Sequence, residues 1–220
     1  MKFVKVKTSH GSLGKNKPTE LAPDLIIDST EEIVFNNNIE EINKQLEESG
    51  GDFFIGGDHS ITYPLFKSFA KKYKNPGLII FDAHPDCTDD FEPPTHEDFV
   101  RVLINKGILK PENLLLIGVQ KVVLKEKEFL EKNNIKILEK PTIEQINKFL
   151  KPFDGFYLSI DIDVLDKKYA PGTGYPDGKL ELDYLLDILK QLKPNKIDLV
   201  ESTPEDIESA RKVYKNLSIK

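Results

Sequence analysis

Two aspartates at the end of an apolar stretch are the residues of this sequence best suited to hold a cation. The segment FYLSIDIDVLD, residues 156–166, alternates over most of its length, with Asp161 and Asp163 expected on the same face of a strand. Side chains two apart on a strand point the same way, with Cα atoms roughly 6.5–7 Å apart. Two carboxylates this close are unfavourable without a positive charge between them, so the spacing favours a metal site over an acidic strand end on a solvated edge.

Two other segments carry further candidate ligands. The segment DAHPD, residues 82–86, follows an apolar run and alternates three side chains that bind metals: Asp82, His84 and Asp86. The segment GGDHS, residues 56–60, adds His59, although a Gly-Gly turn that leads into a helix N-cap explains this segment alone equally well. We expect the three segments to act together.

The elements that must position these residues follow a repeated strand-helix pattern. Short apolar runs that read as strands alternate with amphipathic, helix-type patterns, and the runs lie at residues 3–6, 52–55, 78–81, 114–119, 135–138, 156–166 and 197–200. This order predicts an α/β protein of three layers (α/β/α) with a mostly parallel central sheet. Ligands bind at the carboxyl ends of such strands, so the candidate residues should converge there. No repeat or linker divides the sequence, and we expect residues 1–220 to form one domain.

Composition limits the classes of partner. The 220 residues carry a formal net charge of −6, which argues against nucleic acid or an anionic membrane surface. The N-terminal residues lack the apolar stretch of a signal peptide, and no run is long enough to span a membrane. The single cysteine suits a reducing compartment. We therefore expect a cytoplasmic protein.

The three segments, in their order along the chain, resemble the signatures of the ureohydrolase family, which comprises arginases, agmatinases and formiminoglutamases. GGDHS, DAHPD and SIDIDVLD match these signatures, and residues 170–174 and Glu201 match further family positions. The resemblance implies an arginase-like fold, a homo-oligomer, and hydrolysis of the C–N bond of a linear guanidine or amidine.

The resemblance also implies a centre with two Mn²⁺ ions and six protein ligands. Two aspartates would bridge the ions and a His–Asp pair would complete each of them: Asp82 and Asp161 as bridges, His59 with Asp86, and His84 with Asp163. Four carboxylates among six ligands suit Mn²⁺, whereas Zn²⁺ more often takes four ligands with more His or Cys. Co²⁺, Fe²⁺ and Ni²⁺ stay open as alternatives. Two ions about 3.5–4 Å apart can activate a water for attack on a guanidinium carbon.

Three catalytic positions follow from the same resemblance: His96, Glu201 and the ligand Asp86. Glu201 would pair with the guanidinium, a geometry that favours a bidentate contact, or else serve only as a carboxylate beside the last helix. His96 would move a proton to the departing amine, or else be an exposed loop histidine. The family's usual glycine after this histidine is Glu97 here, and a lysine, Lys167, replaces a frequent proline.

Two other kinds of metal-dependent hydrolase fit the motifs less well. A calcineurin-like metallophosphatase needs more histidines than the four present, and a histone-deacetylase-like hydrolase binds one zinc with fewer acidic ligands. A non-catalytic metal-binding homologue remains an alternative, which urea release would separate from an enzyme.

The substrate prediction rests on the loop at residues 87–95. This loop carries Asp89, Asp90 and Glu92 and no basic residue, so it should attract a doubly cationic guanidine. The sequence thus favours agmatine, hydrolysed to putrescine and urea, which would place the protein in polyamine metabolism. Arginine, formiminoglutamate or another guanidine are alternatives, and so is a merely solvated acidic loop.

Overall fold

The centre of the molecule is an eight-stranded sheet with the order β2-β1-β3-β8-β7-β4-β5-β6. The structure is a computed structural model that describes residues 2–13, 18–28, 31–34 and 38–217. Every pair of neighbouring strands is parallel. The strands are β1 (Phe3–Lys7), β2 (Glu32–Val34), β3 (Phe53–Ile55), β4 (Pro76–Phe81), β5 (Leu114–Ile117), β6 (Lys136–Leu138), β7 (Gly155–Asp161) and β8 (Lys196–Val200). The expected parallel sheet is confirmed.

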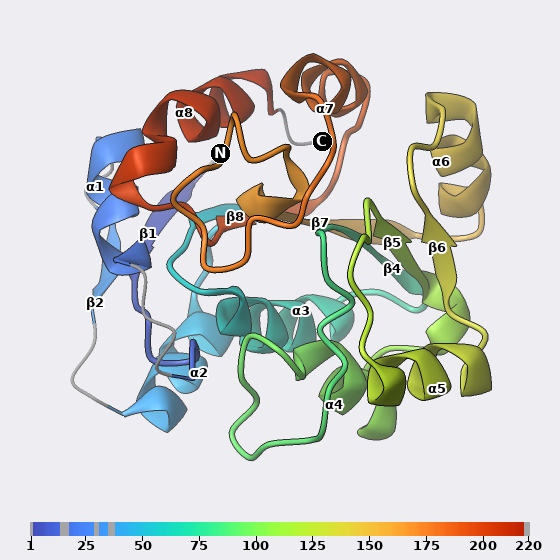
Figure 1. Cartoon of the computed structure of the whole chain (residues 1–220). Helices are drawn as coiled ribbons and strands as arrows, with labels where there is room; N and C mark the ends of the chain where they lie inside the picture. Colours follow the sequence, from blue (N-terminus) through green and yellow to red (C-terminus); the bar gives the residue numbers. More distant parts are fainter. Residues whose placement is uncertain (1, 14–17, 29–30, 35–37, 218–220) are drawn as a thin grey trace.

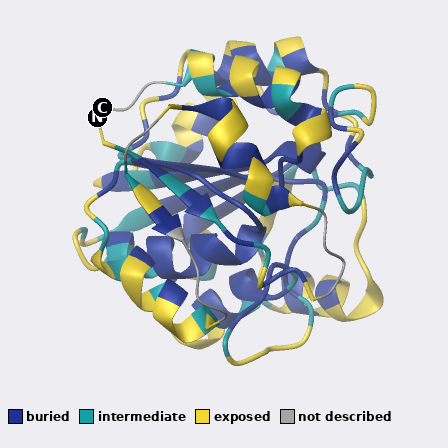
Figure 2. Cartoon of the chain, turned by 90° about the vertical axis from the view of Figure 1, so that its left-hand side faces the viewer, coloured by how far each residue is buried: buried dark blue, intermediate teal, exposed yellow. Residues whose placement is uncertain are grey.

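Helices cover both faces of the sheet (Figure 1). One face is packed by α1 (Ala22–Ile26), α6 (Ile143–Leu150), α7 (Leu182–Leu189) and α8 (Ile207–Asn216). The other is packed by α2 (Ile39–Glu48), α3 (Thr62–Ala70), α4 (Phe99–Asn105) and α5 (Leu124–Lys132). Figure 2 shows the buried strands between helices whose outward sides are exposed. The three-layer α/β/α architecture is confirmed. It arises because each apolar face of the sheet must be covered by its own layer of helices.

Short 3₁₀ helices mark several turns, and one of them corrects a prediction. They are η1 (Thr19–Leu21), η2 (His59–Ile61), η3 (Pro111–Asn113), η4 (Ile162–Val164) and η5 (Pro204–Asp206). The strand β7 ends at Asp161, so the expectation that Asp163 continues its alternation is wrong. The carboxylate of Asp161 accepts a hydrogen bond from the Asp163 N–H at 2.8 Å, and this local bond turns the chain into η4.

The sequence pattern also missed two small elements, α1 and β2, which are too short to show a clear period. Thr203 is the N-cap of η5, with Pro204 after it, and α8 begins only at Ile207.

The parallel arrangement brings the ends of β3, β4, β7 and β8 to one edge of the sheet. These four strands carry the residues that the motifs singled out, either in their last positions or in the turns that follow. No helix in the described part of the chain is both long and apolar enough to cross a membrane. That the whole of residues 1–220 forms one domain stays a prediction.

Candidate metal centre and active site

His59 is placed by the turn after β3. Asp58 caps η2, because its carboxylate accepts hydrogen bonds from Ser60 N and Gly11 N, both at 3.0 Å. The turn requires glycine at position 57, where a Cβ would lie 1.5 Å from the Thr8 carbonyl oxygen. The backbone of this turn therefore determines the position of the His59 side chain.

The ring of His59 faces three carboxylates. Its Nδ1 lies 2.9 Å from Asp86 Oδ2, 3.1 Å from Asp82 Oδ2 and 3.3 Å from Asp161 Oδ2. His59, Asp82 and Asp86 are all buried and offer ligand atoms within 4.8 Å of one another. This first group could hold one metal ion.

A second group shares Asp82 with the first. His84 Nδ1 lies 3.0 Å from Asp163 Oδ2 and 3.5 Å from Asp82 Oδ1. The ligand atoms of Asp82, His84 and Asp163 also lie within 4.8 Å of one another. The Ala83 N–H donates to Asp163 Oδ1 at 3.1 Å, which ties the turn after β4 to η4. The structure thus brings all six predicted ligands together as two adjoining groups, with Asp161 beside the first.

The electrostatics of these groups fit divalent cations. Burial and the charge of Asp82 raise the pKa of the Asp86 carboxyl well above its usual range. Burial and the charges of Asp163 and Asp82 do the same for the pKa of Asp161, and burial and Asp82 raise that of Asp163 to about 6. Among the described residues, no hydrogen bond reaches Asp82 Oδ2 or His59 Nδ1, and both atoms are buried. Two hard cations would neutralise these crowded carboxylates and would bind the buried atoms that lack a hydrogen bond.

A buried network behind His59 escaped the sequence analysis. His59 Nε2 lies 2.9 Å from Ser159 Oγ, which donates to Asp198 Oδ1 at 2.6 Å. Asp198 Oδ2 also accepts from Thr62 Oγ1 at 2.8 Å and from the Tyr157 hydroxyl at 2.6 Å. Because the Ser159 hydroxyl donates to a carboxylate, it accepts from Nε2–H of His59, and this tautomer leaves the Nδ1 lone pair for a cation. Two features of the sequence could have indicated this network: Ser159, two residues before Asp161, and Asp198, an aspartate within the buried strand β8.

His96 and Glu201 form a second buried pair. His96 Nδ1 lies 3.2 Å from Glu201 Oε1, which also accepts from the His59 N–H at 2.8 Å. Burial disfavours the charged imidazole, but the hydrogen bond to Glu201 and the charges around it raise the pKa of His96 to about 9. His96 is 8% exposed, so the reading of an exposed loop histidine is wrong. Glu201 has a left-handed backbone (φ 59°), as does Asp86 (φ 47°), a strained geometry typical of functional sites.

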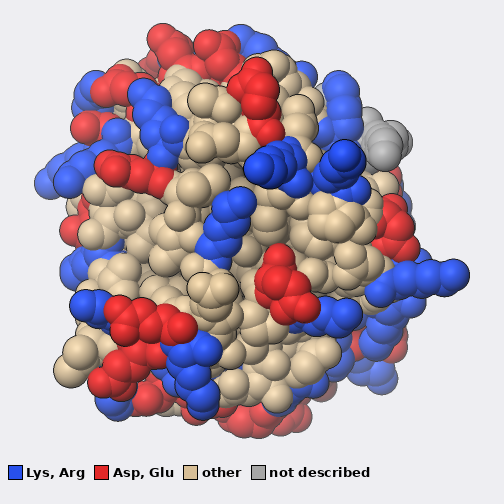
Figure 3. All heavy atoms as spheres, turned by 90° about the vertical axis from the view of Figure 1, so that its right-hand side faces the viewer, with Lys and Arg blue, Asp and Glu red and all other residues tan. Residues whose placement is uncertain are grey.

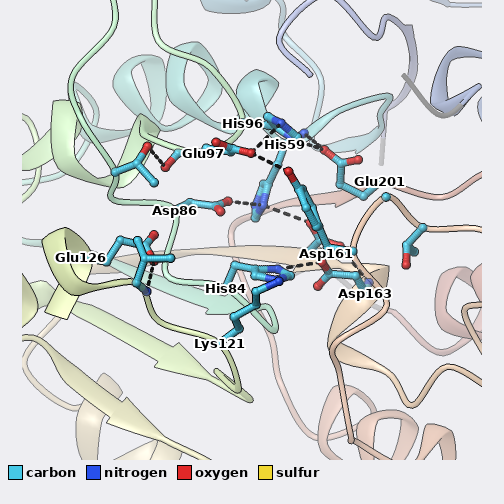
Figure 4. A pocket seen from close by; sticks show the side chains of 15 residues that line it. His59, His84, Asp86, His96, Glu97, Lys121, Glu126, Asp161, Asp163 and Glu201 are labelled. Carbon is cyan, nitrogen blue, oxygen red and sulfur yellow. Dashed lines mark hydrogen bonds and ion pairs between the residues drawn. The ribbon is translucent and has the colours of Figure 1, made fainter. Parts of the chain in front are cut away.

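These side chains open onto one pocket of about 240 Å³ (Figure 4). Most of the predicted site residues line it, and its wall is completed by residues from three separate loops. The lining residues are His59, His84, Asp86, Thr88, His96, Glu97, Lys121, Val123, Glu126, Asp161, Asp163, Thr173, Gly174, Tyr175 and Glu201. Asp82 is 1% exposed and lies beneath this surface.

The acidic loop at residues 87–95 does not support the substrate argument built on it. Asp89 pairs with Lys125, Glu92 pairs with Lys106 at 2.5 Å, and Asp90 accepts from Asn105 at 2.8 Å. None of these three carboxylates lines the pocket. Lys106, at the C-cap of α4, and Lys125 of α5 balance two of these charges, and Arg101 of α4 lies 3.7 Å from Asp90. The sequence could not assign these partners.

Comparison with known proteins assigns the fold and the family. The sequence profile of the arginase family matches residues 5–214. The crystal structure of arginase from Bacillus subtilis superposes with a TM-score of 0.82 at 22% identity, covering 98% of this chain and 96% of that one. Formimidoylglutamase from Bacillus subtilis subsp. subtilis str. 168 gives a TM-score of 0.84 at 20% identity, covering 98% and 84%. The expected arginase-like fold is confirmed.

Curated relatives divide between two activities. An arginase of Staphylococcus aureus (strain MRSA252) is 32% identical over 210 residues, covering 82% of this chain and 68% of that protein. An agmatinase of Bacillus anthracis is 31% identical over 175 residues, covering 75% and 60%. This chain thus spans about two thirds or less of the length of these relatives. The profile match and these identities show that the chain belongs to the arginase family, the metal-dependent hydrolases of linear amidine C–N bonds.

Proposed function

We propose that this protein hydrolyses the C–N bond of a linear guanidine in a site that holds two Mn²⁺ ions. The observation that carries the proposal is the pair of His–Asp groups that share Asp82 and adjoin the His96–Glu201 pair in one pocket. Co²⁺, Fe²⁺ and Ni²⁺ remain alternatives to Mn²⁺ because the ligand chemistry accepts them.

Each candidate ligand has a proposed place. His59 and Asp86 would hold one ion, His84 and Asp163 the other, and Asp82 and Asp161 would reach both. Two bound ions supply an activated water at neutral pH. Glu126, whose carboxylate accepts from Cys87 N at 3.3 Å and Val123 N at 3.0 Å, braces the turn that carries Asp86.

The remaining groups would position the substrate and move a proton. Glu201, held by His59 N and His96, would accept a bidentate hydrogen bond from the guanidinium and fix its carbon over the metal ligands. As water adds to this carbon, a C–O bond forms and the bond to the alkylamine breaks. His96, with a pKa raised to about 9, carries a proton at neutral pH and would give it to the departing nitrogen. The products are urea and a free amine.

The charges around the pocket favour a dicationic substrate. The four candidate aspartate ligands balance the four positive charges of two Mn²⁺ ions. Beyond them, among the residues that the structure describes at the pocket, carboxylates outnumber the groups that carry positive charge: Glu97, Glu126, Glu201 and Asp177, which pairs with Lys121, against Lys121 and His96. The excess matches agmatine, which would give putrescine and urea. Figure 3 shows acidic and basic side chains interspersed over the face formed by α5, β6 and α6, so this face carries no patch of one sign.

Arginine is the second candidate, and Lys121 is the observation that favours it. Lys121 lines the pocket and could meet an α-carboxylate. Its ammonium, however, lies 3.2 Å from Asp177 Oδ2, so its charge is already balanced. We therefore place agmatine first.

A panel of guanidines and amidines tests the proposed function. Protein loaded with Mn²⁺ is assayed for urea or formamide with agmatine, arginine, guanidinobutyrate and formiminoglutamate. We expect urea from agmatine with the highest kcat/KM. No product from any of the four would favour a non-catalytic metal-binding homologue instead. The cytoplasmic location and the homo-oligomer stay predictions.

A further inference from the structure

Glu97 places a carboxylate on the pocket wall beside the candidate proton donor. Glu97 Oε1 lies 3.8 Å from His96 Nε2, and the Glu97 side chain is 27% exposed. Glu97 directly precedes the N-cap residue of α4, Asp98, and its carboxylate lines the pocket. Figure 4 shows Glu97 beside His96 and on the opposite side of the pocket from Lys121. The position is therefore one that a bound substrate can reach.

Several hydrogen bonds hold Glu97 in this orientation. The Tyr175 hydroxyl donates to Glu97 Oε1 at 2.9 Å. The backbone carbonyl of Glu97 accepts from Thr88 N at 3.0 Å and from Thr88 Oγ1 at 2.8 Å. The carboxylate is thus fixed before a ligand arrives, which reduces the ordering cost of binding.

The surroundings of Glu97 suit a cation more than an anion. Its neighbours include the Tyr175 hydroxyl and ring, and the ring lies 6.5 Å from that of His96 and 5.5 Å from that of His84. An aromatic face and a half-buried carboxylate together attract an ammonium group. Lys121 already lies 5.5 Å from the centroid of the Tyr175 ring. The Tyr175 ring thus already has one cation near it in the structure.

The placement of Glu97 and Glu201 on either side of His96 determines how far apart the two cationic groups of a ligand must be. Glu201 contacts Nδ1 of His96 and Glu97 lies near Nε2, so one imidazole ring separates the two carboxylates. A guanidinium at Glu201 and an ammonium at Glu97 would be joined by a short alkyl chain that passes over His96.

We propose that Glu97, with Tyr175, is the specificity-determining site for the distal ammonium group of a dicationic guanidine. The inference rests on the proposed function, because it takes Glu201 as the partner of the guanidinium. It goes further in naming the residue that selects an amine over a carboxylate at the far end of the substrate. The chemistry at the guanidinium is unaffected by this assignment.

The test compares agmatine with butylguanidine, which lacks only the distal amine. Loss of a charged hydrogen-bond partner weakens a contact by roughly tenfold or more. In Glu97→Gln we expect the ratio of kcat/KM for agmatine to that for butylguanidine to fall about tenfold. Both substrates are assayed on the same sample, so any unfolded fraction cancels in the ratio. Glu97→Asp keeps the charge and should retain most of the preference. The matched control is Glu92→Gln, which makes the same change at a carboxylate outside the pocket lining and should leave the ratio as in the wild type.

A binding measurement separates failure of this inference from failure of the proposed function. Calorimetry on Mn²⁺-loaded protein gives the ratio of dissociation constants for agmatine and butylguanidine. If no guanidine is hydrolysed, the proposed function fails, and the binding ratio still decides the role of Glu97. If the wild type hydrolyses agmatine but Glu97→Gln leaves both ratios unchanged, the ammonium site is wrong and the proposed function stands.

Discussion

The floor and the mouth of the pocket are built in different ways. The floor consists of six candidate ligands, most of them buried, at or just after the ends of β3, β4 and β7: His59, Asp82, His84, Asp86, Asp161 and Asp163. The mouth consists of Glu97, Lys121, Tyr175 and Asp177, which come from three loops far apart in the sequence. Side-chain contacts join these loops at the mouth. The floor thus belongs to the sheet, and the mouth belongs to the loops. We infer that the sheet edge sets the reaction and that the loops set the substrate.

The largest expected effect is at the residue that both groups of the floor share. Asp82→Ala should lose both Mn²⁺ ions and reduce turnover below detection, because Asp82 offers one oxygen to each group. Asp161→Ala should behave in the same way. Metal content per chain is measured by mass spectrometry after dialysis, with Asp90→Ala as the control. Retention of two ions by both site variants would show that neither aspartate is a bridge.

The next effect separates chemistry from metal binding. His96→Ala should lower kcat by about 10²–10⁴-fold while metal content stays at the wild-type value, because His96 is proposed to give up a proton and not to hold an ion. His59→Ala should instead lower metal occupancy first. Steady-state kinetics and metal analysis are made on the same preparations. Wild-type turnover in His96→Ala would remove this histidine from the mechanism.

A smaller effect is expected at Asp198, which contacts the candidate ligand His59 through the Ser159 hydroxyl. Asp198→Asn should weaken Mn²⁺ binding by about 10–100-fold, because the Ser159 hydroxyl that orients His59 loses the carboxylate to which it donates. Competition with a chelating dye measures the dissociation constant, and Asp154→Asn, at an exposed carboxylate that accepts only from backbone amides, is the control. Equal affinities in the two variants would leave the network with a purely structural role.

The smallest effect is expected at the acidic loop near the mouth. Asp89→Asn and Glu92→Gln should change kcat/KM for agmatine by less than about twofold, because exposed ion pairs with lysine contribute little. The assay is urea release at low and physiological salt. Losses as large as that of Glu97→Gln would mean that the whole loop, and not the pocket wall, attracts the substrate.

The contrast between floor and mouth also explains what sequence reasoning could predict. Parallel strands end at one edge, so Asp82 after β4 and Asp161 at the end of β7 could be placed together from periodicity alone. Asp163 was assigned to the right neighbourhood but the wrong element, because a single hydrogen bond from its N–H to Asp161 ends the strand. Strand periodicity does not encode such a local bond.

The mouth could not be predicted, because its contacts depend on how loops pack in space. Glu97 and Tyr175 are joined by one hydrogen bond across 78 positions of the sequence. Asp89 and Lys125 form an ion pair across 36 positions, which balances a charge that the sequence suggested was available to a substrate. The contact between Ser159 and Asp198 could not be predicted either, because it depends on which strands lie side by side and in which register.

We propose that the floor holds two ions that share carboxylate ligands. Electron paramagnetic resonance of protein titrated with Mn²⁺ tests this directly, because ions bridged by Asp82 and Asp161 must be magnetically coupled. We expect two Mn²⁺ per chain and the spectrum of an exchange-coupled pair. Saturation at one ion per chain would show that the site does not hold two ions. The spectrum of isolated Mn²⁺ at two ions per chain would show that the ions do not share ligands.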